Sequence, residues 1–188
     1  MAKTALLTVG STEFPSLVSA FLSVSFISKL ASSLGITTVY AQIGRSTLPH
    51  GFSIGLQNVD GVQVEVTQFA DDLEGRVGQS DLVISHAGAG SILSFLRPFP
   101  TSSDSQKPTQ RRLILVPNDT LMDSHQSDLA DKMETKGWAT VCRDATDLTT
   151  AIERVARDEK NRPEGVKEFL DLDKRKVPLI LDETLGYA

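Results

Sequence analysis

The residues best suited to chemistry lie in residues 80–94, SDLVISHAGAGSILS. A short apolar run, typical of a parallel strand covered on both faces, leads into His86, a glycine-rich turn and the start of a helix. Gly88 and Gly90 let a ligand approach the main chain, and the hydroxyl of Ser91 can cap the first N–H groups of that helix. Unpaired N–H groups and the partial positive charge of a helix N-terminus attract anions, so this stretch predicts a pocket for a diphosphate or a sugar nucleotide. An ordinary strand–helix turn, with glycines only for close packing, is the alternative.

Two histidines are candidates for a catalytic group. His86 ends the strand, where it can meet a phosphate or an acceptor or be satisfied by a backbone carbonyl, and the sequence leaves both open. His125 is followed by Gln126, and its predicted helix opens on the same edge of the sheet. Asp123 is two residues from His125 and does not share a helical face with it, so a catalytic dyad is not expected there. His50 lies in a loop rich in glycine and proline and is expected to face solvent.

Several other chemistries do not fit the sequence. SHAGAG lacks the nucleophile-elbow pattern of a hydrolase, and the loop that begins at Gly10 lacks the second and third glycines of a dinucleotide fingerprint. The histidines and acidic residues show no metal-ligand spacing, so neither a metal nor a cofactor is expected. Cys142, the only cysteine, cannot form an internal disulfide and is expected in the core.

Length and charge narrow the class of protein further. A chain of 188 residues can form one sizeable α/β domain. Its net charge of -5 argues against nucleic acid as a partner, because phosphate backbones are bound by basic surfaces. We expect no signal peptide, because residues 1–3 lead directly into a predicted strand, and the sequence has no uninterrupted apolar stretch of about 18 residues. We therefore expect a cytoplasmic protein with no transmembrane segment of its own.

Strand and helix patterns alternate along the chain. Predicted strands cover residues 5–9, 37–43, 62–69, 81–85, 113–116 and 138–142, and predicted helices cover 15–34, 71–79, 91–97, 123–136 and 146–157. Gly35 is expected to end the first helix and Thr146 to cap the last, while residues 46–61 read as a loop. This alternation predicts a Rossmann-like parallel sheet with helices on both faces and right-handed crossovers.

The loops that follow the strands define one edge of that sheet. In open parallel sheets, ligands bind beyond the carboxyl ends of the strands. The loops 10–14, 42–45, 85–91 and 118–126 share this edge, which we call the rim. Residues 1–157 are expected to form the domain, with 98–110 as a polar surface insertion. Residues 158–188 form a charged tail with apolar faces, which packs on the domain or docks a partner.

Four motifs in order, TVGSTEF, QIGR, SDLVISHAGAGSIL and PNDTLMDSHQSDLA, resemble those of one family of enzymes over about residues 5–157. The family comprises the catalytic subunits of the eukaryotic UDP-N-acetylglucosamine transferase of dolichol-linked oligosaccharide synthesis, which is similar to the C-terminal half of MurG-type GT-B glycosyltransferases. The resemblance implies transfer of GlcNAc from UDP-GlcNAc to dolichyl-diphosphate-GlcNAc. It also implies a membrane-anchored, acceptor-binding partner subunit that recruits the chain to the cytosolic face of the endoplasmic reticulum.

The same resemblance implies individual roles. Main-chain N–H groups of the first loop and of the glycine turn are expected to approach the diphosphate, residues 69–70 to hold uracil, and residues 125–126 to bond the GlcNAc hydroxyls. The implied UDP-GlcNAc-binding set is Gly10, Ser11, Thr12, Phe69, Ala70, His86, Gly88, Ala89, Gly90, Ser91, Ser94, Asn118, His125 and Gln126.

Two features depart from the family pattern. Ser94 stands where relatives carry a glutamate that grips the ribose diol, and a serine makes one neutral bond in place of two charge-assisted ones. This favours the rival hypothesis of a non-catalytic nucleotide-sugar-binding or assembly subunit. The other departure is the insertion at 98–110, whose role the sequence does not give. No residue is a confident general base, and a base from the partner is compatible with the resemblance.

Overall fold

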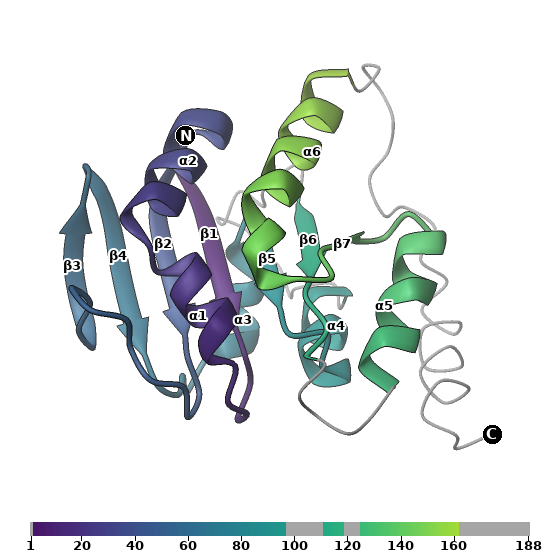
Figure 1. Cartoon of the computed structure of the whole chain (residues 1–188), viewed down its shortest axis with the longest axis horizontal. Helices are drawn as coiled ribbons and strands as arrows, with labels where there is room; N and C mark the ends of the chain where they lie inside the picture. Colours follow the sequence, from purple (N-terminus) through teal and green to yellow (C-terminus); the bar gives the residue numbers. More distant parts are fainter. Residues whose placement is uncertain (1, 97–110, 119–124, 162–188) are drawn as a thin grey trace, which may run out of the picture.

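A seven-stranded sheet forms the centre of the chain, seen in the computed structural model, which describes residues 2–96, 111–118 and 125–161 (Figure 1). The strand order is β3-β4-β2-β1-β5-β6-β7. Every neighbouring pair is parallel except β3 and β4, so the predicted parallel sheet carries an antiparallel edge. The strands are β1 (Lys3–Thr8), β2 (Ile36–Gln42), β3 (Gly55–Val59), β4 (Val62–Thr67), β5 (Leu82–Ser85), β6 (Arg112–Leu115) and β7 (Thr140–Val141).

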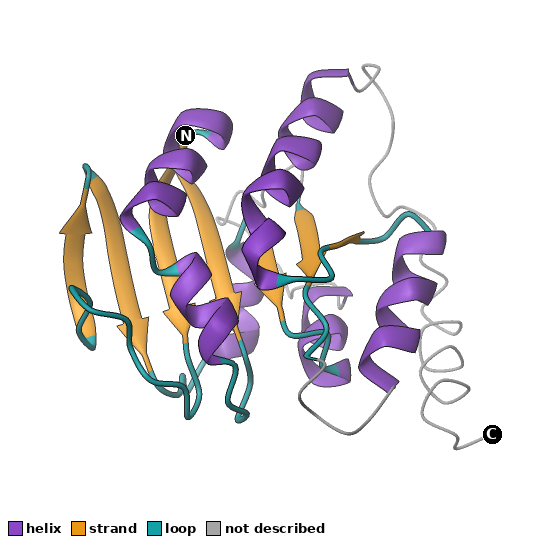
Figure 2. Cartoon of the chain, in the orientation of Figure 1, coloured by secondary structure: helices purple, strands orange, loops and turns teal. Residues whose placement is uncertain are grey.

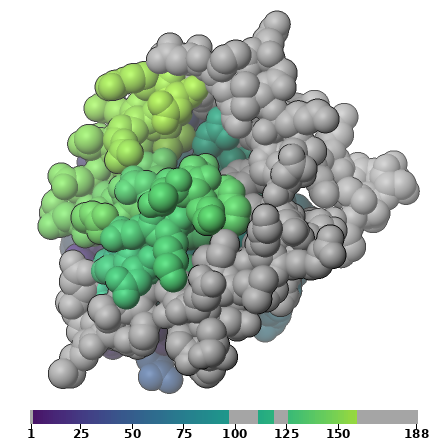
Figure 3. Space-filling view, turned by 90° about the vertical axis from the view of Figure 1, so that its right-hand side faces the viewer, coloured from purple at the N-terminus to yellow at the C-terminus, as the bar shows by residue number. Residues whose placement is uncertain are grey.

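Helices cover both faces of the sheet, as the alternation predicted (Figure 2). They are α1 (Pro15–Phe21), α2 (Val24–Leu34), α3 (Leu73–Gln79), α4 (Ala89–Leu96), α5 (His125–Thr135) and α6 (Leu148–Asn161), with a 3-10 turn η1 (Ala145–Asp147). One core cluster lies under α1, α2 and α6, and the other under α3, α4 and α5. Figure 3, viewed from the β7 side, shows α5 and α6 on the described surface there.

The central strand explains the two cores. Leu6 and Leu7 are neighbours in β1 and are both 0% exposed, but they belong to different core clusters. Successive side chains of a strand point to opposite faces, so an unbroken apolar run requires cover on both sides. The apolar runs in β5 and β6 are buried in the same way.

The predicted single helix over 15–34 is wrong, because the structure has two helices bent by 57°. Ser23 separates them: its side chain accepts a hydrogen bond from the N–H of Phe26 and caps α2. A serine that caps a helix start competes with continued helix, and this outweighs the apolar periodicity across the break. Gly35 ends α2 in the left-handed conformation, at φ 70°, as predicted.

The prediction of a loop over 46–61 is also wrong in part, because β3 pairs with β4 in a hairpin. Asp60 and Gly61 form the turn, with φ of 49° and 83°. An Asp-Gly pair with positive φ at both positions is the usual sequence of a type I′ hairpin turn, so this signal was available in the sequence. The predicted cap Thr146 is wrong as well: the carboxylate of Asp144 accepts from the N–H of Thr146.

Arg111 fixes α3 and α4 against each other. Its guanidinium donates to the carbonyl oxygens of Val77 at 2.7 Å, Phe95 at 3.0 Å and Ser80 at 3.4 Å. It also lies over the Phe95 ring, 4.2 Å from the ring centroid. The carbonyls at the end of a helix lack intrahelical partners, and a guanidinium satisfies several of them at once.

Among the described helices, none alone is long and apolar enough to cross a membrane. The bent pair α1 and α2 meets the length and composition test together. Most of their apolar side chains are core residues, however, and Leu17, Phe21, Ile27 and Leu30 are all 0% exposed.

Candidate functional site

The rim forms as the sequence predicted, because the ends of the parallel strands are in register. Thr8 pairs with Gln42 on one side and with Ser85 on the other. The loops that leave these ends contact one another. The N–H of Phe14 donates to Ser46 Oγ at 2.8 Å, and the N–H of Arg45 donates to the carbonyl of Thr12 at 3.2 Å.

The start of α4 is an open group of hydrogen-bond donors. The first intrahelical bond runs from Ile92 N–H to the carbonyl of Gly88, at 3.1 Å. The N–H groups of Ala89, Gly90 and Ser91 have no acceptor within the described part of the chain. A Cβ built on Gly90 would meet no atom of a described residue within 4 Å, so no described part of the chain covers this side of the turn. Helix N–H groups in this position can bind an anion.

Ser91 and Gly88 differ from their predicted roles. Ser91 is the third residue of α4, and its hydroxyl makes no capping bond to a described residue, so the predicted cap is wrong. Gly88 is needed for space, since a Cβ there would clash with the imidazole of His86. Between His86 and Gly88 the chain turns at Ala87, a non-glycine residue with φ 62°. Such a backbone is costly for alanine and often marks functional sites.

His86 is packed inside the rim. It is 7% exposed, and its Nδ1 lies 3.4 Å from the carbonyl oxygen of Thr8. A carbonyl can only accept, so this contact assigns the hydrogen to Nδ1 and leaves Nε2 as an acceptor. Burial lowers the pKa of His86 below its usual value, and the ring is therefore neutral near pH 7. Of the two interpretations left open by the sequence, the structure favours a histidine satisfied by a backbone carbonyl.

The first loop offers fewer main-chain donors than predicted. The N–H of Gly10 donates to Thr8 Oγ1 at 3.2 Å, and the N–H of Thr12 donates to the carbonyl of Val9 at 3.3 Å. Thr12 Oγ1 donates to the same carbonyl at 2.7 Å. Among residues of this loop, the N–H groups of Ser11 and Glu13 have no described acceptor. The expectation that Gly10 and Thr12 present their amides to a ligand is therefore wrong in this conformation.

Gln42 is a site residue that the sequence reasoning missed. It is the last residue of β2 and is 2% exposed, yet its side chain is polar. Oε1 accepts from Thr8 Oγ1 at 2.6 Å, and Nε2 donates to the carbonyls of Gly10 and Gln68, each at 2.7 Å. The available signal was a glutamine at the end of a predicted buried strand, where a polar group must find partners.

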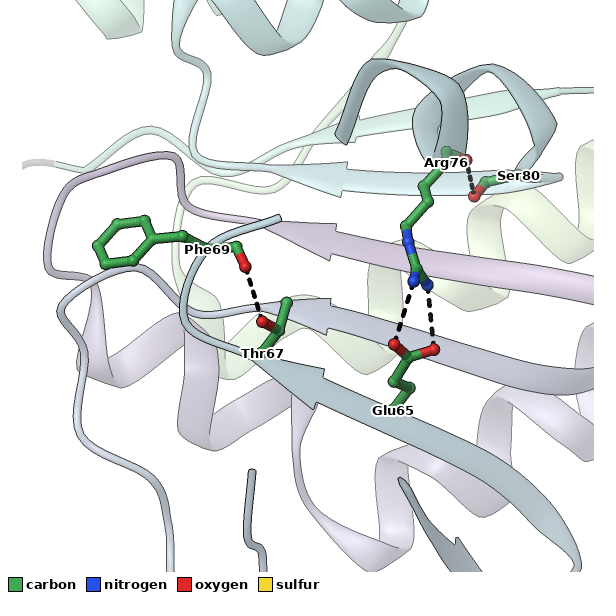
Figure 4. Close-up of polar contacts among 5 residues, drawn as sticks. All are labelled: Glu65, Thr67, Phe69, Arg76 and Ser80. Atoms are coloured by element: carbon green, nitrogen blue, oxygen red, sulfur yellow. Dashed lines mark hydrogen bonds and ion pairs between the residues drawn. The ribbon is translucent and has the colours of Figure 1, made fainter. Parts of the chain in front are cut away.

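Phe69 lies beyond the carboxyl end of β4, with its ring projecting away from the sheet (Figure 4). The ring is 56% exposed, and the main chain is held because Thr67 Oγ1 donates to the carbonyl of Phe69 at 2.7 Å. Ala70 follows, partly buried against the core under α3. An exposed aromatic ring next to a fixed main chain can form one wall of a site for a flat heterocycle.

The helix that follows this loop is anchored to the sheet. Arg76 of α3 donates to both carboxylate oxygens of Glu65, at 3.0 and 3.1 Å (Figure 4). Its guanidinium lies 3.9 Å from the centroid of the Tyr40 ring. Ser80 Oγ donates to the carbonyl of Arg76 at 2.7 Å. A bidentate pair fixes orientation as well as distance, so α3 is held against β4.

The loop after β6 joins the rim through Asn118. This residue is 2% exposed, and its Nδ2 donates to the carbonyl of Glu13 at 3.1 Å. Its N–H donates to Gln126 Oε1 at 3.1 Å, which leaves Nε2 of Gln126 for other acceptors. His125 is the first residue of α5. Ser94 lies one turn into α4, where its hydroxyl donates to the carbonyl of Gly90 at 3.0 Å.

The sequence profile of the glycosyltransferase family 28 C-terminal domain matches residues 4–177. The chain belongs to this family. A Cryptococcus neoformans protein named UDP-N-acetylglucosamine transferase subunit ALG13 is 38% identical over 208 aligned residues, covering 98% of this family 28 chain and 97% of the relative. The human protein of the same name is 34% identical over 141 residues, covering 74% of this chain and 11% of the human protein.

The fold of this family 28 chain is similar to those of two solved structures. The NMR solution structure of ALG13 has a TM-score of 0.57 and 25% identity, and the match covers 95% of this chain and 96% of that one. A crystal structure of the glycotransferase of kitacinnamycin has a TM-score of 0.53 at 18% identity, covering 98% of this chain and 42% of that one, and so shows the fold alone. The predicted family resemblance and the Rossmann-like fold are confirmed.

Two predicted segments lie outside the described residues. The insertion at 98–110 and most of the tail at 158–188 are not described, apart from the last residues of α6. Their predicted roles stay predictions. The division into residues 1–157 and a tail stays a prediction for the same reason.

Proposed function

We propose that this family 28 chain binds UDP-GlcNAc at the rim and is the catalytic subunit of a two-chain N-acetylglucosaminyltransferase. The transfer moves GlcNAc to dolichyl-diphosphate-GlcNAc, the second step of lipid-linked oligosaccharide assembly. The partner is a membrane-anchored subunit that binds the acceptor at the cytosolic face of the endoplasmic reticulum. Support comes from the sequence resemblance and from relatives that are named subunits of a UDP-N-acetylglucosamine transferase.

One observation carries the proposed donor site: the unpaired N–H groups of Ala89, Gly90 and Ser91 open on the same rim as the unpaired N–H of Ser11. These N–H groups offer partial positive charge to an anion, and no charged side chain is needed for this. In the transfer, negative charge builds on the departing UDP diphosphate. Main-chain donors fixed in place stabilise that charge with little reorganisation, and the α4 dipole adds to the effect.

The remaining parts of the donor have candidate partners on the rim. Phe69 forms an apolar wall for uracil, with the main chain of residues 69–70 beside it. Gln126 keeps Nε2 as a donor for a sugar hydroxyl. The acceptor hydroxyl needs a general base. His86 is buried between Gly10 and Gly88, so we propose that the base comes from the partner chain. The donor is bound without any cofactor.

Ala89→Pro tests the site by removing one proposed donor. Proline lacks the N–H but is favoured at the first position of a helix, so α4 should still form. A charge-assisted hydrogen bond contributes about 1.5–3 kcal/mol, so UDP affinity should fall about tenfold or more in calorimetric titration of the full chain. Val24→Pro is the matched control, because Val24 is the first residue of α2, outside the rim. Equal UDP affinity in both variants and the wild type would overturn the proposed pocket.

A second candidate function is a nucleotide-sugar-binding or assembly subunit without catalytic activity. The observation in its favour is Ser94, whose hydroxyl is bonded to the Gly90 carbonyl in α4. Transfer by the reconstituted two-chain complex separates the two functions. A catalytic donor subunit loses turnover when Ala89→Pro is introduced. An assembly subunit with the same substitution keeps full turnover, provided that the complex still forms.

A further inference from the structure

The side chain of Gln42 is fully hydrogen-bonded in a buried position. A glutamine amide offers two N–H donors on Nε2 and an acceptor oxygen, and all are used here. Nε2 donates to the carbonyls of Gly10 and Gln68, each at 2.7 Å, and Oε1 accepts from Thr8 Oγ1 at 2.6 Å. Thr8 Oγ1 in turn accepts from the N–H of Gly10 at 3.2 Å, so its own hydrogen is available for Gln42.

The two carbonyls belong to different loops of the rim. Gly10 precedes Ser11, whose N–H is unpaired, and Gln68 precedes the exposed ring of Phe69. The main chain after β2 adds further ties to both loops: Gly44 N–H donates to the carbonyl of Gln68 at 3.0 Å, and Arg45 N–H donates to the carbonyl of Thr12 at 3.2 Å. The side-chain amide of Gln42, at the end of β2, is thus bonded to both loops. Hydrogen bonds of a buried amide cost more to lose than exposed ones. Without Gln42, the carbonyl of Gly10 would lose its described donor, whereas the carbonyl of Gln68 would keep the bond from Gly44 N–H.

We propose that Gln42 is a positioning residue of the donor site. It sets the spacing between the loop that presents the Ser11 amide and the loop that presents Phe69. The loop at Ser11 follows β1 and the loop at Phe69 follows β4. Gln42 would hold these two loops, and with them the diphosphate and the uracil, at a fixed separation. This inference rests on the proposed function, since it names the residue that aligns the two halves of the same nucleotide site.

Gln42→Met is the direct test, because methionine keeps the length of the side chain and removes both N–H donors. We expect UDP affinity to fall at least tenfold in the full chain at a temperature where circular dichroism shows it folded. Gln57→Met is the matched control: Gln57 Nε2 donates to the carbonyl of Ser53 at 2.9 Å on the exposed edge strand β3. Its UDP affinity should equal that of the wild type.

A double-mutant cycle separates positioning from a general effect on stability. Phe69→Ala alone should weaken UDP binding. If Gln42 positions Phe69, the double variant Gln42→Met/Phe69→Ala should lose at least threefold less affinity than the product of the two single losses. Losses that multiply would contradict the proposal. So would wild-type affinity in Gln42→Met.

A measurement on the wild type keeps the proposal testable even where Gln42→Met does not fold. Hydrogen exchange of the Gln42 side-chain amide, followed by NMR, should slow at least threefold when UDP is added, because the ligand holds both loops. The Gln57 side-chain amide should not change. An unchanged Gln42 amide in UDP-saturated protein overturns the inference and leaves the proposed function intact. A wild-type chain that binds no UDP overturns the proposed function, and the inference with it.

Discussion

Gly90→Ala should make the protein more stable and a worse binder of UDP. Gly90 is the second residue of α4, and a Cβ built there has no described neighbour within 4 Å. Alanine is favoured over glycine in helices by about 0.5–1 kcal/mol, so the free energy of unfolding should rise by about that amount. For a domain of this size, about 1 kcal/mol corresponds to a rise in Tm of about 2–4 °C.

The same methyl group should block the ligand. If the diphosphate approaches the unpaired N–H groups of α4, the added carbon holds it away from at least one of them. Losing one charge-assisted bond of about 1.5–3 kcal/mol lowers UDP affinity by about tenfold to a hundredfold. Thermal melts followed by circular dichroism and calorimetric titration of UDP measure the two effects separately.

Ser32→Ala is the control for stability, because Ser32 is exposed on α2 and also gains helix propensity. This variant should be slightly more stable and should bind UDP as the wild type does. Two results would refute the reasoning. A Gly90→Ala protein with a higher Tm and unchanged UDP affinity shows that no ligand reaches this turn. A lower Tm shows that the space beside Gly90 is filled.

Four further predictions concern single side chains. Burial lowers the pKa of His86, so as pH falls the histidine is protonated in the unfolded chain before it is protonated in the folded protein. The free energy of unfolding should therefore fall as pH drops below about 6.5. His86→Asn should reduce this dependence, as measured by urea titrations at pH 7.5 and 5.5. Burial raises the pKa of Cys142 to about 11, so a disulfide reagent at pH 8 should label it only as fast as the protein unfolds, and prompt labelling would contradict this. Arg111→Lys removes the guanidinium that bonds the carbonyls of Val77 in α3 and Phe95 in α4, and should lower the free energy of unfolding in urea titrations by about 1–3 kcal/mol. A loss under about 0.5 kcal/mol would contradict this role. Ser94→Glu should tighten UDP binding severalfold, because a carboxylate makes charge-assisted bonds to a ribose diol; weaker binding in calorimetry would place the ribose elsewhere.

The sheet could be predicted from the sequence because its signals are local. An apolar run followed by a glycine or proline turn marks β1, β5 and β6, and the rim follows from parallel order alone. The errors arose where a local polar group outweighed the apolar pattern. Ser23 caps a new helix inside an unbroken apolar periodicity, and Asp60 with Gly61 turns a polar segment into a hairpin.

The candidate site could be predicted less well, because its chemistry depends on contacts between distant residues. Sequence spacing located the glycine turn at the start of α4, and its amides are unpaired as required. It could not show that the N–H of Gly10 is bonded to Thr8 Oγ1, or that Gly88 makes room for His86. Gln42 contacts Thr8 and Gln68, which lie 34 and 26 residues away, and such pairs emerge only when the strands are aligned.

A site built from main-chain donors also bears on the choice between enzyme and binding subunit. The unpaired amides of α4 and Ser11 would stabilise charge on a leaving diphosphate whatever residue stands at position 94. In the proposed site, Ser94 would change how tightly the ribose is held, which would affect ground state and transition state alike and alter KM more than kcat. A serine at this position therefore weighs little against catalysis. The decisive property is whether the amides of α4 contact the departing diphosphate, and Ala89→Pro addresses that contact directly.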